Sequence, residues 1–323
     1  MIQKKITMFL NVAKYCFPIL IGFIIIAMIV ATPFIIKARS EGDLYAIAEL
    51  PTPVLNTPDF SFVFGHKDGK TLHLDDSGLI REVEFIALPK TVFKIENSIK
   101  RGTHTIYKIT TEDYPYPPQK GYFIDSRFVK TVDYKPPNRL KGLSTKKAII
   151  NILLSSEGSR YIWGGNYKEG IPQILSFYPP TFPISPEIKD QWMLKGVDCS
   201  GLLYEATNGF TPRNTSSLIT FGEPVKIEGL SAHQIIQEVE PLDIIVWKGH
   251  VMIVLDKERV IESRLDYDKE QEGNQGGVRI SDLKEVLGEI LKERIPVNNY
   301  EDGIERGKQK FVIRRWYSIM QNK

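Results

Sequence analysis

The chain has 323 residues, of which 42% are hydrophobic and 25% are charged. Such a composition is typical of a globular protein with a buried core, and the length allows about two folded units. The formal net charge is only +3, and no stripe of Arg and Lys with interleaved aromatic residues is present, so we expect no nucleic-acid partner.

Residues 17–36 form a run without a charged residue, which is long enough to cross a bilayer as a helix. Three lysines precede the run, whereas one lysine and one arginine follow it closely, which favours an exported body. A cleaved signal peptide is the alternative, although Ile29 is a poor minus-three residue for a site near Ala31. We expect residues 1–40 to anchor the protein in the inner membrane, with its body in the periplasm or cell-wall space, or secreted after signal cleavage.

Residues 41–59 predict an extended linker, because three prolines interrupt a polar segment. Residues 60–134 then alternate short apolar runs with turn residues, which is typical of a small β-barrel. The expected strands are Ser61–Phe64, Thr71–Leu74, Glu84–Leu88, Thr91–Ile95, Thr105–Ile109 and Tyr122–Ile124. The last strand, with the residues up to Val129, resembles the closing strand and short helical turn of bacterial SH3-like domains.

The second expected domain covers residues 139–323, after a boundary at Lys135–Asn138 that holds two prolines. A helical pattern begins at Ser144, and a second helix begins at Cys199 and ends before Gly209, which suits a C-terminal cap. Strands are expected at Asp243–Trp247, His250–Leu255, Arg259–Ser263, Gly277–Ile280 and Phe311–Trp316. Helices followed by an antiparallel sheet predict an α+β fold.

Cys199 and His250 are the candidate chemical groups. Cys199 is the only cysteine after the apolar run, and His250 opens a strand-like segment. A thiol at a helix N-terminus is favoured as thiolate, and a nearby imidazole can hold and return its proton, so the two can act as nucleophile and base. The alternative is that Cys199 is a small buried apolar residue and His250 an ordinary sheet residue.

Five motifs follow one another in the order of a known family. They are Tyr161-Ile-Trp-Gly-Gly, Asp198-Cys-Ser-Gly-Leu, Thr211-Pro-Arg-Asn-Thr, Pro241-Leu-Asp-Ile-Ile and Gly249-His-Val. In this order they resemble the NlpC family of papain-like cysteine peptidases of bacterial cell walls, over residues 144–317. The resemblance implies a papain-like fold and cleavage of the γ-D-glutamyl bond to the diamino acid in peptidoglycan stem peptides.

The resemblance also implies residue roles. Cys199 is the nucleophile, His250 the base, and Tyr161 lies near the oxyanion site, or else packs as a core aromatic. Asp198 and Ser200 help to hold the substrate, or Asp198 merely caps the helix. Arg213 matches a recurrent arginine with a structural role.

Glu262 lies twelve residues after His250, where the family usually has a second histidine that orients the first. A glutamate can also accept a hydrogen bond from imidazole. A two-residue hairpin at Lys257-Glu258 would place Glu262 and His250 on opposite faces of the sheet, so we expect a bulge or strong coiling there.

Other readings stay open. The same residues could serve an amidase or an acyltransferase acting on cell-wall material, or the domain could be an inactive wall-binding protein. We expect no cofactor and no metal site, because the five histidines are scattered without ligand spacing. The long segments 166–197 and 281–309 could wall the cleft, and the aromatic residues of the first could equally be ordinary packing.

Overall fold

The computed structural model describes residues 43–266, 276–301 and 309–320. The chain divides into Met1–Asp43 and one compact unit, Leu44–Lys323. The predicted membrane segment lies outside the described residues. Within the described part of the chain, no helix combines the length and apolar character needed to cross a membrane.

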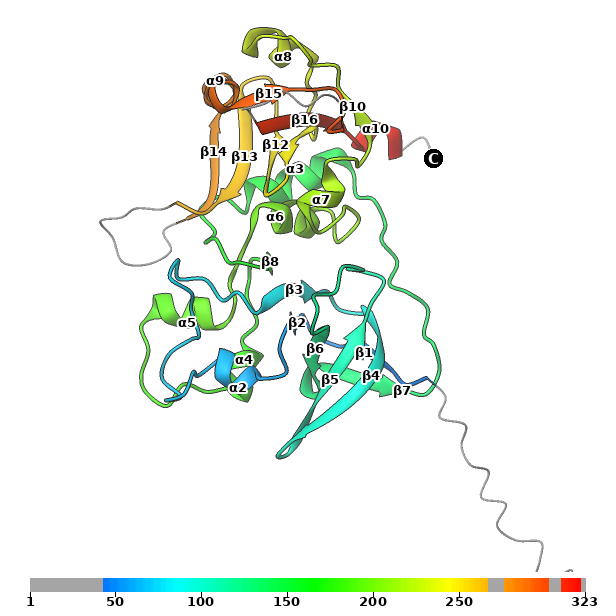
Figure 1. Cartoon of the computed structure of the whole chain (residues 1–323), viewed down its shortest axis with the longest axis vertical. Coiled ribbons are helices and arrows are strands. Elements are labelled where there is room, and N and C mark those ends of the chain that lie inside the picture. Colours follow the sequence, from blue (N-terminus) through cyan, green and yellow to red (C-terminus); the bar gives the residue numbers. More distant parts are fainter. Residues whose placement is uncertain (1–42, 267–275, 302–308, 321–323) are drawn as a thin grey trace, which may run out of the picture. The chain divides into compact units, whose positions relative to one another are not determined.

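The first sheet has seven antiparallel strands in the order β3-β2-β6-β5-β4-β1-β7 (Figure 1). The strands are β1 Tyr45–Ala48, β2 Thr52–Leu55, β3 Val83–Ala87, β4 Val92–Arg101, β5 His104–Thr110, β6 Tyr122–Asp125 and β7 Val129–Val132. A short turn of 3₁₀ helix, Ser126–Phe128, joins the last two. The expected strands from Glu84 onward and the short helical turn are therefore confirmed.

Three expectations for this region are wrong. The predicted linker 41–59 contains β1 and β2. Pro53 is tolerated in β2 because it is paired with Ile86, whose backbone N–H and C=O bond to the Asn166 side chain and not to β2. The missing N–H of proline therefore costs no hydrogen bond between β2 and β3. Ser61–Val63 lies in the helix α2 (Phe60–Val63), and Phe64 is its C-cap; the buried residues here follow helical rather than alternating spacing. Thr71–Leu74 is not a strand.

The second sheet runs β10-β16-β11-β12-β13-β14, with β15 parallel to β16 and every other pair antiparallel. Its strands are β10 Glu223–Pro224, β11 Ile244–Trp247, β12 His250–Val254, β13 Arg259–Arg264, β14 Gly277–Asp282, β15 Arg294–Pro296 and β16 Gln309–Arg315. The five strands expected here are present, and the fold is mixed α+β with antiparallel sheets.

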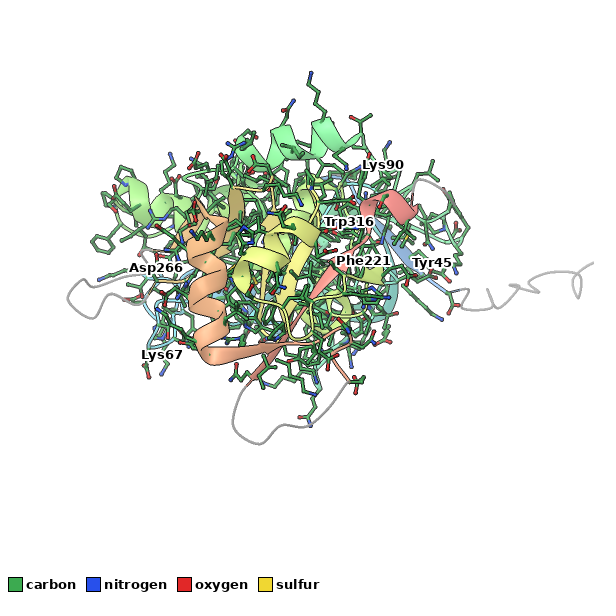
Figure 2. All side chains as sticks on the ribbon, turned by 90° about the horizontal axis from the view of Figure 1, so that it is seen from above. Tyr45, Lys67, Lys90, Phe221, Asp266 and Trp316 are labelled. Atoms are coloured by element: carbon green, nitrogen blue, oxygen red, sulfur yellow. The ribbon has the colours of Figure 1, made fainter. Side chains whose placement is uncertain are left out.

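Helices cover both faces of the second sheet. Alternate residues of β12 such as Val251 pack with α3 (Lys146–Leu154) and α6 (Cys199–Ala206), whereas Met252 packs with α8 (Ala232–Glu238) and α9 (Leu283–Glu293). Two short helices, α7 (Thr215–Leu218) and α10 (Tyr317–Met320), complete the unit. Trp316, at the end of β16, is fully buried beside Phe221, with ring centroids 5.8 Å apart (Figure 2).

The segment 166–197 packs into the core of the first sheet. It forms β8 (Asn166–Tyr167), α4 (Gln173–Phe177), α5 (Pro186–Trp192) and β9 (Gly196–Val197). Its residues Tyr178 and Trp192 are buried in the same apolar cluster as the strands of the first sheet, and the Tyr178 hydroxyl donates to Asp125 at 2.5 Å. Tyr178 and Trp192 are therefore packing residues, whereas Phe182 is exposed. A boundary at Lys135–Asn138 does not separate two independent cores, because this cluster holds residues from both sides of it.

Candidate active site

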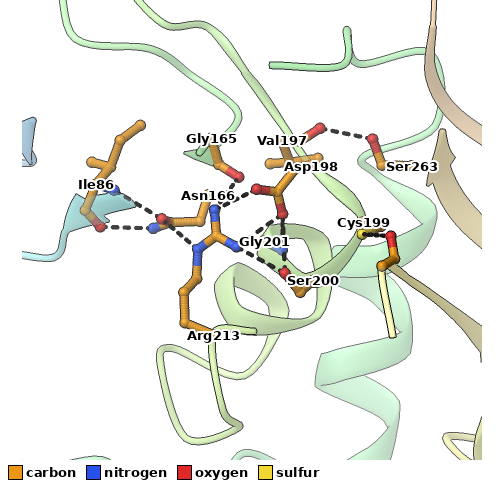
Figure 3. Close-up of polar contacts among 11 residues, drawn as sticks. Ile86, Gly165, Asn166, Val197, Asp198, Cys199, Ser200, Gly201, Arg213 and Ser263 are labelled. Carbon is orange, nitrogen blue, oxygen red and sulfur yellow. Dashed lines mark hydrogen bonds and ion pairs between the residues drawn. The ribbon is translucent and has the colours of Figure 1, made fainter. Parts of the chain in front are cut away.

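Cys199 is the first residue of α6, and Asp198 is its N-cap. The Asp198 carboxylate accepts a hydrogen bond from the backbone N–H of Gly201 at 2.7 Å, which satisfies a donor left free at the helix start. The Cys199 thiol lies 4.0 Å from the carbonyl oxygen of Gly249, directly before β12 (Figure 3). The helix start and the beginning of the His250 strand thus meet at the thiol.

His250 and Glu262 form a hydrogen-bonded pair on neighbouring strands. Nε2 of His250 lies 2.5 Å from Oε2 of Glu262, and both side chains are largely buried. Beside Glu262, the Ser263 hydroxyl donates to the carbonyl of Val197 at 2.7 Å, which ties β13 to the strand that leads to Cys199 (Figure 3). Since Glu262 occupies Nε2, Nδ1 is the ring nitrogen left for the thiol.

The expected bulge between His250 and Glu262 is not found. Val254 pairs with Val260, and the N–H of Leu255 donates to the carbonyl of Arg259, so three residues rather than two form the connection. Asp256 shapes this turn, because its Oδ1 accepts from the backbone N–H groups of Glu258 and Arg259. With three residues in the turn instead of two, the register between β12 and β13 shifts by one residue. This shift alone places the side chains of His250 and Glu262 on the same face of the sheet.

The charges around His250 favour the protonated ring. Burial lowers the pKa of His250, but the interactions with Cys199 and Glu262 outweigh it and raise the pKa to about 9. Burial raises the pKa of Glu262, but the hydrogen bond and the charge of His250, followed by the charge of Arg279, outweigh it, so this pKa is lowered. Arg279 contacts the second carboxylate oxygen, at 3.3 Å. His250 is therefore an imidazolium that the Glu262 carboxylate holds in place.

Asp198 and Ser200 are joined to Arg213, which is buried. The guanidinium binds both carboxylate oxygens of Asp198, at 2.9 and 2.7 Å, and donates to the hydroxyl of Ser200 at 2.8 Å (Figure 3). Asp198 also caps α6, so its acceptors are used within the protein. These contacts favour the capping alternative for Asp198 and agree with the structural role expected for Arg213.

Asn166 is the residue that the sequence did not single out. Its side-chain amide oxygen accepts from Ile86 N–H at 2.9 Å and from Arg213 Nε at 3.0 Å, and its amide nitrogen donates to the Ile86 carbonyl at 2.8 Å. It thereby joins the edge of the first sheet to the network that holds the start of α6. Its partners are 47 and 80 residues away in sequence, so no local pattern marks it.

Tyr161 lies in the same cleft as the thiol. The cleft has a volume of about 380 Å³ and is lined by Leu79, Arg81, Tyr161, Trp163, Cys199, Gly249, His250, Arg264 and Leu265. Burial, together with the charges of Asp198 and Cys199, raises the pKa of Tyr161, so its hydroxyl remains a neutral donor. Across residues 43–266, 276–301 and 309–320, no group of three or more His, Cys, Asp or Glu side chains is arranged to hold a metal ion.

We expect Arg213→Met to lower the free energy of unfolding by about 3–5 kcal/mol, because it leaves the buried Asp198 charge without its partner. The matched control is Arg259→Met, which removes an exposed ion pair with Asp256 and should leave the free energy of unfolding close to that of the wild type. Urea unfolding followed by circular dichroism measures both. Equal midpoints for the two variants would contradict a buried supporting network.

The sequence matches no family model and no curated protein. Among solved structures, one similar chain is an NlpC/P60 family protein from Bacillus cereus ATCC 10987, with 15% identity and a TM-score of 0.30; the match covers 85% of this chain but 64% of that one, less than two thirds of its length. Another is RipD from Mycobacterium tuberculosis, described as a non-catalytic NlpC/p60 domain protein with adaptation to peptidoglycan-binding function. Its identity is 16% and its TM-score 0.27, over 52% of this chain and 95% of that one.

This chain therefore has structural similarity to NlpC/P60 family proteins, at TM-scores too low to assign it a family or an activity. The SH3-like domain likewise remains a prediction. What bears on function is the geometry around Cys199.

Proposed function

We propose that this chain is a cysteine peptidase that cleaves the γ-D-glutamyl–diamino acid bond of cell-wall stem peptides. The observation that carries the chemistry is the 2.5 Å bond between His250 and Glu262, which fixes the imidazole beside the Cys199 cleft. The substrate class comes from the resemblance of the five motifs to the NlpC family. The partner is accordingly the stem peptide of peptidoglycan.

The reaction uses the two groups in turn. The Cys199 thiolate attacks the scissile carbonyl carbon, forming a C–S bond, while the proton taken from the thiol stays on His250. As the tetrahedral intermediate collapses, the C–N bond breaks and His250 gives its proton to the leaving amine. His250, now neutral, takes a proton from the water that hydrolyses the thioester. Glu262 stabilises the protonated ring and keeps it oriented.

Two donors suit the developing oxyanion. The backbone N–H of Cys199, at the first position of α6, has no partner within the helix, and Tyr161 supplies a neutral phenol in the same cleft. We assign Asp198 and Ser200 to holding the start of α6 through Arg213 rather than to contacting the substrate, because their polar atoms are already bonded there.

A panel of defined substrates tests the proposed function in the purified full-length protein. With L-Ala-γ-D-Glu-meso-diaminopimelate, mass spectrometry should find L-Ala-D-Glu and free diaminopimelate. An amidase would instead separate sugar from peptide in a muropeptide, and an acyltransferase would join the acyl group to an added amine, giving a product heavier than that amine. Binding of muropeptides without any turnover would contradict the proposal and leave a wall-binding protein.

We also propose that residues 1–40 anchor the chain in the inner membrane, with the folded unit on the outer side. The support is the uncharged run 17–36 and the excess of lysine before it. Cell fractionation should find the full-length chain in membranes, where protease added to spheroplasts digests it. A free chain shortened near Ala31 would show signal cleavage instead.

A further inference from the structure

Arg81 comes from the segment before β3, yet it lines the cleft of Cys199. Its Nε lies 2.5 Å from Oδ2 of Asp75. The other oxygen of Asp75 accepts from the backbone N–H groups of Ser77 and Leu79, each at 2.9 Å. The carboxylate that holds Arg81 is thus itself fixed by its own loop.

The Trp163 ring packs against a face of the Arg81 guanidinium. The carbon centre of the Arg81 guanidinium lies 4.1 Å from the centroid of the Trp163 ring, a cation–π contact. Trp163 precedes Gly164, whose φ of +70° and close approach to the Val83 carbonyl leave no room for a Cβ atom. The first sheet and the Tyr161–Gly165 segment are therefore in backbone contact, and Arg81 keeps a defined place relative to Cys199.

The side chains of permanent charge that line the cleft are all basic. Its lining includes two arginines, Arg81 and Arg264, and no carboxylate. Among the described residues, no acceptor hydrogen-bonds to Nη1 or Nη2 of Arg81, so the outer edge of its guanidinium is available. Arg264 is the more exposed of the two and lies 3.8 Å from Asp266. A preorganised guanidinium with a free edge suits a carboxylate.

We propose that Arg81 is a specificity-determining residue that binds the free α-carboxylate of the glutamyl residue whose γ-carbonyl is attacked. This inference rests on the proposed function. A glutamyl residue joined through its γ-carboxyl keeps a free α-carboxylate, which three carbon atoms separate from the scissile carbonyl, whereas D-isoglutamine carries a neutral amide in its place. Arg81 thereby selects substrates in which this α-carboxylate is not amidated.

Two peptides that differ in one group test this inference. They are L-Ala-γ-D-Glu-meso-diaminopimelate and its D-isoglutamine counterpart, in which the α-carboxylate is an amide. The full-length wild type should have a kcat/KM about 10- to 100-fold higher on the acid, the range expected for a hydrogen bond to a charged group. Arg81→Gln should bring this ratio close to one, mainly by losing activity on the acid. Arg264→Gln, the matched control in the same cleft, should keep most of the ratio.

The outcomes separate the inference from the function on which it rests. Equal kcat/KM values for both peptides in the wild type, or an unchanged ratio in Arg81→Gln, would overturn the role of Arg81 while the peptidase activity stands. Wild type that cleaves neither peptide would overturn the proposed function, and the role of Arg81 with it. Because the ratio compares two substrates on one enzyme, a general loss of folded Arg81→Gln protein leaves it unaffected.

Discussion

Replacing Cys199 with alanine is expected to abolish turnover of the γ-D-glutamyl tripeptide, because the variant lacks the atom that forms the covalent bond. A loss of about 10⁴-fold or more in kcat is typical when a nucleophile is removed. His250→Ala should lose nearly as much, and the double variant little more, since the two groups act as one unit. Release of diaminopimelate, followed by mass spectrometry, measures all three.

Cys16→Ala is the control for this experiment, as Cys16 is the other cysteine of the sequence. It should retain wild-type turnover, and prior alkylation should inactivate it as it does the wild type. Turnover by Cys199→Ala above the rate without enzyme would contradict the whole mechanism.

Glu262→Gln is expected to lower kcat by roughly 10- to 10⁴-fold with little change in KM, the upper value being typical of a wrong histidine tautomer. The amide keeps the size of the side chain but removes the charge that helps to raise the pKa of His250 to about 9. In the wild type, activity should fall as pH rises through this pKa, since the ring then loses the proton it gives to the leaving amine. In Glu262→Gln the fall should occur at lower pH.

Asp256→Asn is the matched control, because Asp256 is the nearest rival carboxylate in sequence but serves the turn between β12 and β13. Its oxygens accept from Glu258 and Arg259, and no described contact joins it to His250. Its pH profile should match that of the wild type. If Asp256→Asn shifts the profile and Glu262→Gln does not, Glu262 is not the orienting group.

Most of the second sheet could be predicted because its strands are continuous apolar runs between turn residues, and the start of α6 because Asp198 is a good N-cap. The pairing of His250 with Glu262 was implied by the resemblance to the NlpC family, but the turn that brings both side chains to one face was not predicted. That face depends on whether the turn holds two or three residues, which the bonds of Asp256 decide.

The first sheet shows where local pattern is insufficient. β1 and β2 are short, and Pro51 and Pro53 precede and interrupt β2, so their sequence is typical of a linker. They are strands because β3, β4 and β7 provide partners. Asn166 and Arg81 were missed for a related reason. Each acts on residues distant in sequence, Asn166 on Ile86 and Arg81 in the cleft of Cys199, and only the folded chain brings them together.

Alkylation of Cys199 by iodoacetamide, resolved from Cys16 by peptide mapping, tests the central claim most directly. Cys199 lines an open cleft beside a protonated imidazole. We expect rapid labelling of Cys199 near neutral pH, slowed by His250→Ala and by saturating substrate peptide. Labelling of Cys199 at the same rate in the wild type and in His250→Ala would contradict an activated thiolate, and with it the proposed peptidase.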